Sequence, residues 1–171
     1  MKAPTPVNRQ AGISLLEVLI ALLVLAIGAL GFAGLQMTSL NQSTAANHRV
    51  TAVLIAQDAV ERMELNPSER DDYLTDNWAA GSFGGSPSTD CVGAGSDCGP
   101  SDILAWDIAQ LTWQAANQLP AGRVAVDECA FNNDLICVNV SWDGQDPAAC
   151  MGSSGVNTDL DSNCFVLEVA R

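Results

Sequence analysis

Apolar residues are concentrated near one end of the chain. Residues 1–12 are polar and basic, whereas residues 13–35 are apolar except for Ser14 and Glu17. A helix over residues 13–35 rises about 35 Å at about 1.5 Å per residue, which is enough to cross a hydrocarbon core of about 30 Å. The pattern therefore predicts a transmembrane helix over residues 13–35.

The helical periodicity continues after this segment. Apolar side chains recur every three or four positions as far as residue 65. The Asn66-Pro67 pair then disfavours helix, because the residue before a proline avoids the helical region. We therefore expect residues 36–66 to form the second half of one long helix. Its apolar positions are Val50, Val53, Ala56, Val60 and Met63.

Residues 67–171 have the pattern of a small mixed domain. Glycine and proline punctuate residues 68–102, which predicts loops. Ser101 and Asp102 are typical of a helix cap, and they predict a second helix that ends at Pro120. We therefore expect an α+β ladle, in which the long N-terminal helix packs against a small antiparallel sheet with a second short helix. The predicted strands lie at residues 123–126, 136–142 and 164–170.

The charge balance excludes several classes of function. The chain has 7 Lys and Arg residues against 20 Asp and Glu residues, for a net charge of −13. Nucleic-acid binding is therefore not expected, because phosphate contacts need clustered basic residues. Lys2 is the only lysine and His48 the only histidine, which argues against a His-centred triad. The glycine spacing in residues 93–99 does not match a nucleotide-binding loop. We expect no enzyme activity and no cofactor.

All six cysteines follow the long helix. An even number of cysteines outside a membrane segment indicates disulfides in an oxidising compartment, and no C-x-x-C motif is present to indicate zinc. Many connectivities are possible, and the local set is favoured because short loops close most readily. The favoured pairs are Cys91 with Cys98, Cys129 with Cys137, and Cys150 with Cys164.

One acidic stretch near residue 160 imitates a calcium loop. Four Asn and Asp side chains alternate there, and Glu168 stands at the twelfth position, where a calcium loop has its last ligand. However, Ser162 replaces the glycine that such a loop requires, and Glu168 lies in a strand pattern. A solvated turn is favoured over a calcium site. The alternating residues are Asn157, Asp159, Asp161 and Asn163.

Glu17 is the only charged residue of the apolar segment, and it therefore bears on the function of that segment. A charge deep in a bilayer costs on the order of 2.5–3.5 kcal/mol, so such a group usually has a partner. The alternative is that Glu17 lies near the cytoplasmic surface of the membrane, where its side chain reaches the polar headgroup region. Lys2 and Arg9 precede the segment, which places the N-terminal side in the cytoplasm. A cleaved secretory signal is disfavoured by the length and the carboxylate, and a plain anchor leaves Glu17 unexplained.

Gly12 followed by residues 13–21 (ISLLEVLIA) resembles the class III signal of type IV pilins and type II secretion pseudopilins. The resemblance implies that a prepilin peptidase removes residues 1–12 as a cytoplasmic leader and methylates Ile13. It also implies that Glu17 is the assembly carboxylate, which faces the terminal amine of a neighbouring subunit. The family usually has Phe where this chain has Ile13, and commonly Thr where it has Ser14.

Interior segments are similar to PilV, the type IV pilus modification protein family of minor pilins. The resemblance implies a minor pilin that acts in priming and tip assembly of the fibre, and so in adhesion and twitching motility. The alternatives are a minor pseudopilin of type II secretion, or an envelope enzyme or binding module on a plain anchor. The similar segments are residues 24–36, 56–63 with Asn66-Pro67, 106–110, 119–122 and 138–142.

The same resemblance implies partners and a location. The expected partners are the prepilin peptidase, other minor pilins, the major pilin and the inner-membrane assembly platform. The chain is then a single-pass inner-membrane protein before assembly, with residues 67–171 as a periplasmic, disulfide-containing head. After assembly it lies in the pilus fibre, at its tip.

Overall fold

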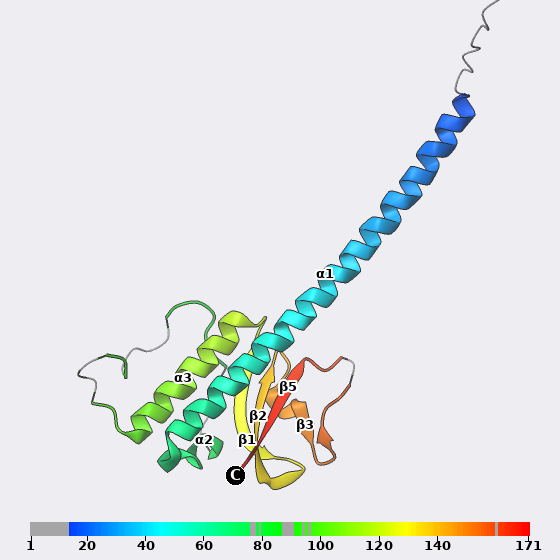
Figure 1. Cartoon of the computed structure of the whole chain (residues 1–171). Helices are drawn as coiled ribbons and strands as arrows, with labels where there is room; N and C mark the ends of the chain where they lie inside the picture. The colour runs from blue at the N-terminus through cyan, green and yellow to red at the C-terminus, as the bar shows by residue number, and fades with distance from the viewer. Residues whose placement is uncertain are drawn as a thin grey trace, which may run out of the picture. The chain divides into compact units, whose positions relative to one another are not determined.

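The computed structural model describes residues 14–75, 78, 80–86, 91–93, 95, 97–159 and 161–171. Its contacts divide the chain into two compact units, Met1–Thr44 and Ala45–Arg171. One helix, α1 (Leu15–Leu65), has residues in both (Figure 1).

The first unit consists, in its described part, of the beginning of α1. Every residue of α1 as far as Asn47 is exposed, because no other element that the structure describes covers it. By length and composition, α1 is able to cross a membrane. The predicted apolar helix is therefore present, although its expected first residue, Ile13, lies outside the described residues.

The end of α1 falls where the sequence places it. The helix stops at Leu65, and Asn66 and Pro67 follow in non-helical and 3-10 conformations. The Asn66 side chain is buried and donates from Nδ2 to the carbonyl oxygen of Pro100 over 2.9 Å. This bond joins the end of α1 to the next long helix. The described residues between them include a 3-10 turn, η1 (Pro67–Glu69), and a short helix, α2 (Asp72–Thr75).

The second helix begins earlier than predicted. α3 runs over Pro100–Gln118, and its N-cap is Gly99 rather than Ser101 or Asp102. Asp102 lies at the third helical position, where its Oδ2 accepts a hydrogen bond from the Gly99 N–H over 3.0 Å. Proline is favoured in the first turn because its missing N–H has no partner there in any case. Asp102 therefore caps the helix from inside it.

The three predicted strands form one antiparallel sheet. β1 (Arg123–Cys129) pairs with β2 (Asn132–Ser141), and β2 pairs with β5 (Cys164–Ala170), so the order is β1-β2-β5. β1 and β2 are longer than predicted. A two-stranded hairpin of β3 (Met151–Gly152) and β4 (Gly155–Val156) follows the 3-10 turn η2 (Pro147–Cys150), and the sequence did not predict it.

The core of the second unit lies between one face of this sheet and the two long helices. Ala52, Ala56 and Ala59 of α1 are completely buried, and their small side chains allow the helix to approach its neighbours closely. α1 and α3 lie side by side over the sheet (Figure 1). The α+β class, with a long helix, a small antiparallel sheet and a further short helix, is confirmed. The other core residues are Ile55, Met63, Tyr73, Leu104, Ile108, Leu111, Ala115, Leu119, Val124, Val126, Ile136, Val138, Val140 and Trp142.

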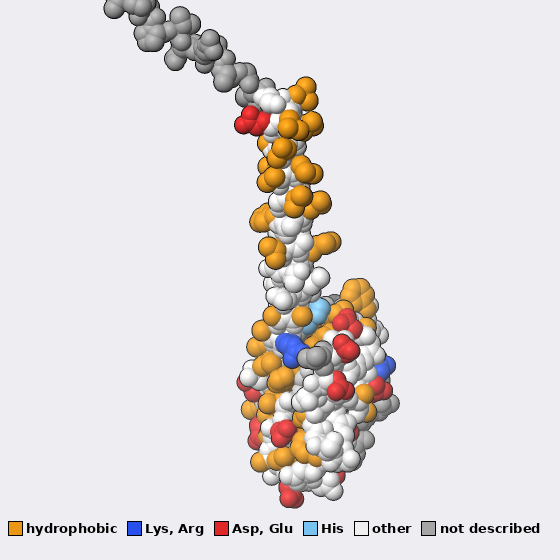
Figure 2. Space-filling view, turned by 90° about the vertical axis from the view of Figure 1, so that its right-hand side faces the viewer, with side chains coloured by type: hydrophobic (Ala, Val, Ile, Leu, Met, Phe, Trp, Pro, Cys, Tyr) orange, Lys and Arg blue, Asp and Glu red, His pale blue; other side chains and the backbone are white. Residues whose placement is uncertain are grey.

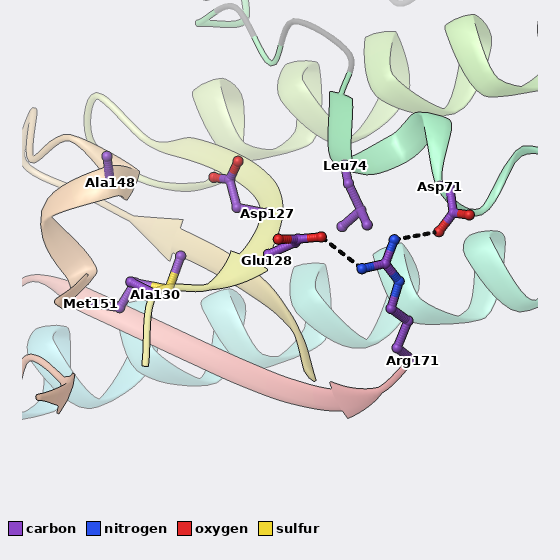
Figure 3. Close-up of a pocket in the computed structure, with 8 residues that line it drawn as sticks. All are labelled: Asp71, Leu74, Asp127, Glu128, Ala130, Ala148, Met151 and Arg171. Atoms are coloured by element: carbon purple, nitrogen blue, oxygen red, sulfur yellow. Dashed lines mark hydrogen bonds and ion pairs between the residues drawn. The ribbon is translucent and has the colours of Figure 1, made fainter. Parts of the chain in front are cut away.

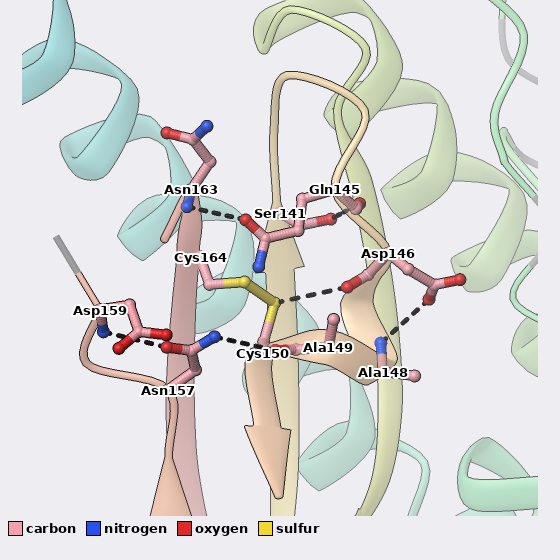
Figure 4. The surroundings of a disulfide bond; sticks show 10 residues. All are labelled: Ser141, Gln145, Asp146, Ala148, Ala149, Cys150, Asn157, Asp159, Asn163 and Cys164. Carbon is pink, nitrogen blue, oxygen red and sulfur yellow. Dashed lines mark hydrogen bonds between the residues drawn. A yellow bond between two sulfur atoms is a disulfide. The ribbon is translucent and has the colours of Figure 1, made fainter. Parts of the chain in front are cut away.

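Three disulfides close local loops. They join Cys91 to Cys98, Cys129 to Cys137, and Cys150 to Cys164, which are the pairs favoured from the sequence. The third bond ties η2 to the start of β5, and hydrogen bonds of Asn157 and Gln145 hold the chain on either side of it (Figure 4). No cysteine of the chain is free.

Candidate functional site

Glu17 lies in the first turn of α1. Its backbone N–H donates to the Ser14 carbonyl oxygen over 3.0 Å, at the first described residue of the chain. The Glu17 side chain is exposed, and within the described residues it has no hydrogen-bond or ion-pair partner. It is also the only Asp, Glu, Lys or Arg between residues 14 and 48.

The surroundings of Glu17 are apolar. Leu15, Leu16 and Val18 are exposed next to it, and hydrophobic side chains cover the helix beyond (Figure 2). A carboxylate in hydrocarbon needs a partner to offset about 2.5–3.5 kcal/mol of insertion cost. The described part of this chain supplies no such partner for Glu17.

Gly12 and Ile13, the predicted cleavage and methylation positions, lie outside the described residues. Their processing therefore stays a prediction from the sequence. The first residue of α1, Leu15, is two positions after Ile13 and two before Glu17 in the sequence.

A second polar site lies between α1, α2 and α3 in the second unit, Ala45–Arg171, which we call the head from here on. Asp107 of α3 is almost completely buried, and its Oδ1 accepts a hydrogen bond from Arg62 Nη1 over 2.7 Å. Its Oδ2 accepts a hydrogen bond from the hydroxyl of Tyr73, which is itself completely buried, over 2.5 Å. One carboxylate therefore joins three helices.

Arg62 has further partners that hold it in place. Its Nε donates to Asp58 Oδ1 over 2.8 Å, and its guanidinium lies 5.1 Å from the centre of the Trp106 ring. Gln114 of α3 donates to the other oxygen of Asp58 over 3.1 Å. Charge-assisted bonds of this kind satisfy buried groups and fix the geometry of the helices that carry them.

The pKa values in this cluster agree with a fully paired site. Burial lowers the pKa of Arg62, but the hydrogen bonds to Asp58 and Asp107 outweigh that effect and raise it above its usual value. Burial, and after it the hydrogen bond to Asp107, raises the pKa of Tyr73. Arg62 is therefore a cation and Tyr73 a neutral donor throughout the physiological range, and the cluster is structural.

The sequence did not single out this cluster, although it contained a signal. Asp107 lies three residues after Leu104 and four before Leu111, which places it on the apolar face of α3. A single acid on such a face requires a buried cation or donor. Which residues supply it depends on the packing of three helices, and no local pattern gives that.

The other candidates from the sequence are not gathered into a site. Asn157 Oδ1 accepts from the Asp159 N–H over 2.9 Å, whereas Glu168 lies in β5 opposite Cys137. Among the residues that the structure describes, no group of three His, Cys, Asp or Glu side chains is placed to hold a metal ion. His48 packs edge-on against Trp142, with ring centres 6.5 Å apart.

Two family models match the chain. The prokaryotic N-terminal methylation motif matches residues 7–33, and the model of type IV pilin Tt1218 matches residues 34–109, so the two matches adjoin. The chain belongs to the type IV pilin family. No curated protein and no solved structure matches the pilin significantly.

The two matches cover both polar sites of this pilin. The methylation motif includes Gly12, Ile13 and Glu17, and it implies processing by a prepilin peptidase and assembly with other pilins. The Tt1218 match includes Arg62 and Asp107. The family is a structural one, and the apolar part of α1 is consistent with insertion in a membrane and with a place in a pilus.

Proposed function

We propose that this pilin is a PilV-like minor pilin, which primes assembly of a type IV pilus and lies at the tip of the fibre. The observation that carries the proposal is Glu17, an exposed carboxylate without a partner in the described chain, which lies at the start of an apolar helix and inside the match to the methylation motif. In that role the head adds no catalysis, and the fibre serves adhesion and twitching motility.

The mechanism follows from the cost of an isolated charge. In the bilayer, Glu17 attracts the methylated amine of Ile13 on a neighbouring pilin, because a charge-assisted pair offsets the desolvation of both groups when the geometry is good. A pair between the first turns of two helices fixes how far one helix is displaced along the other. Other minor pilins, the major pilin and the inner-membrane platform are the partners of this step.

In this proposal the N-terminal part of α1 carries assembly, and the head is attached to the rest of that helix. Its core and its polar cluster hold the second half of α1 against α3 and the sheet, so that the head follows the movement of the helix. The match to a type IV pilin supports a pilus over the alternative, a pseudopilin of type II secretion. Deletion separates the two, because loss of surface pili supports the first and loss of exoprotein release the second.

The experiment that tests the proposal replaces Glu17 in the native host. We expect Glu17→Ala to be cleaved after Gly12 and retained in the membrane, but to be absent from sheared pili. The matched control is Thr38→Ala on the same helix, because the Thr38 hydroxyl is already satisfied by the Gly34 carbonyl oxygen at 3.2 Å. That variant should enter pili normally.

Two results would contradict this account. Incorporation of Glu17→Ala into sheared pili at the level of the unmodified chain would show that the carboxylate is not needed. Mass spectrometry of the membrane-extracted protein supplies the second test. A chain that begins at Met1, or that is cut beyond Leu35, would exclude pilin processing, whereas one that begins at methylated Ile13 supports it.

A further inference from the structure

A groove follows the outer side of β1. Two adjoining cavities form it, with volumes of about 590 Å³ and about 270 Å³, and they share Asp127 and Ala148. Figure 3 shows the larger cavity, in which Asp127 and Glu128 of β1 lie between Ala148 of η2 and Leu74 of α2. We call the two cavities together the β1 groove.

Within the described residues, the backbone of β1 along this groove is paired on one side only. β1 is an edge strand that pairs only with β2, and among the described residues no other backbone hydrogen bond involves it. An edge strand offers a row of N–H and C=O groups that an extended peptide is able to pair with. The walls of the groove carry charged side chains and also apolar ones, among them Leu74, Trp78, Pro147 and Met151.

The charges in the groove do not cancel. Arg171 pairs with Glu128 over 2.6 Å and with Asp71 over 3.1 Å, and Arg123 lies 4.0 Å from Asp146. Asp127, between these pairs, has no hydrogen-bond or ion-pair partner among the described residues. Burial raises the pKa of Asp127, and within the part of the chain that the structure describes no cation offsets this half-buried carboxylate.

We propose that the β1 groove binds an extended segment of a partner protein that carries a lysine or arginine side chain, with that cation on Asp127. The backbone of the segment pairs with the free edge of β1, and its alternate side chains contact the apolar walls. The strongly acidic chain, with its net charge of −13, favours a basic partner over an acidic one. This inference concerns the head alone and holds whichever pilin role is right.

The test measures binding of labelled peptides to the full, oxidised chain in detergent micelles by fluorescence anisotropy. The probe is acetyl-Thr-Val-Thr-Lys-Thr-Val-Thr-amide, and a second peptide has Glu in place of Lys. Empty micelles supply the background. We expect saturable binding of the Lys peptide, at least about tenfold tighter than that of the Glu peptide.

Variants then locate the cation site. Asp127→Asn should weaken binding of the Lys peptide about tenfold or more, and Asp127→Glu should retain most of it. Asp161→Asn removes the same charge from an exposed position that does not line the groove, and it should change nothing. Ala148→Trp, which fills the point shared by the two cavities, should abolish binding of both peptides.

Several outcomes overturn the proposal. They are no saturable binding of the Lys peptide, equal binding of the two peptides, or equal loss in the Asp127→Asn and Asp161→Asn variants. A measurement of self-association, by sedimentation of the unlabelled chain, supplies a further outcome that would overturn the proposal. If Asp127→Asn abolishes self-association, while the peptide does not bind, the occupant is a second copy of this chain and not a basic partner segment.

Discussion

The buried carboxylate of Asp107 offers a sharp test of how the head holds its helices together. Asp107→Ala removes the acceptor of both Arg62 and Tyr73. The Tyr73 hydroxyl is then completely buried without a partner, while Arg62 retains Asp58. Removal of one partner from a buried pair costs about 3–5 kcal/mol. We expect the free energy of unfolding to fall by that amount.

A second substitution, at Tyr73, separates the Tyr73–Asp107 hydrogen bond from the other contacts of the cluster. Tyr73→Phe removes one hydrogen bond to a charged group, and it should cost about 1.5–3 kcal/mol. In the double variant the hydroxyl is absent and so cannot be left unpaired. Its cost should therefore be close to that of Asp107→Ala alone, which corresponds to a coupling energy of about 1.5 kcal/mol or more.

The measurement is equilibrium unfolding of the oxidised chain by urea in detergent micelles. Tryptophan fluorescence is the signal, since the Trp78 ring N–H donates to the Tyr73 carbonyl oxygen over 2.9 Å. Glu61→Ala, an exposed acid on the same helix as Arg62, is the control and should cost less than about 0.5 kcal/mol. Additive costs in the double variant, within about 0.5 kcal/mol, would refute the reasoning.

Three further predictions concern the head. The chain has a single tyrosine, whose pKa is raised above its ordinary value of 10.0, so tyrosinate absorbance should appear only together with alkaline unfolding and not before it. The raised pKa of Asp127 means that its ionised form disfavours folding. Asp127→Asn should therefore raise the urea midpoint at pH 7, by an amount that shrinks as the pH falls towards the ordinary value of 3.8, and a gain independent of pH would contradict this. Serine at both Cys150 and Cys164, which lie 14 residues apart, should lower the free energy of unfolding by about 3 kcal/mol, and an unchanged midpoint would exclude a role for this bond in stability.

Features encoded locally were predictable from the sequence. The end of α1 depends on the Asn66-Pro67 pair. The bounds of β5, Cys164 and Ala170, depend on a run of alternating apolar residues. The apolar segment around Glu17 is equally local, because length and composition define it. The cysteine pairs were favoured correctly because each closes a short loop, the longest with a sequence separation of 14.

Features that depend on distant parts of the chain were not predictable. The pairing of Arg62 with Asp107 joins residues 45 positions apart, and that of Tyr73 with Asp107 joins residues 34 apart. The cap of α3 was misplaced because Ser101 and Asp102 are good cap residues by type, whereas Gly99 followed by a proline sets the true start. The β3–β4 hairpin has two residues in each strand, too few to give an alternating pattern.

The positions of the disulfides have a mechanical consequence. The first cysteine is residue 91, so no covalent cross-link joins α1 to the sheet. A tensile load that reaches the head along α1 passes into the core through side-chain packing around Ala52, Ala56 and Ala59, and into α3 through the ion pair of Arg62 with Asp107. None of the three disulfides crosses this contact, because each joins two cysteines that follow α1. The disulfides therefore constrain the loops of the head, whereas the attachment of α1 to the rest of the head depends on packing in the core.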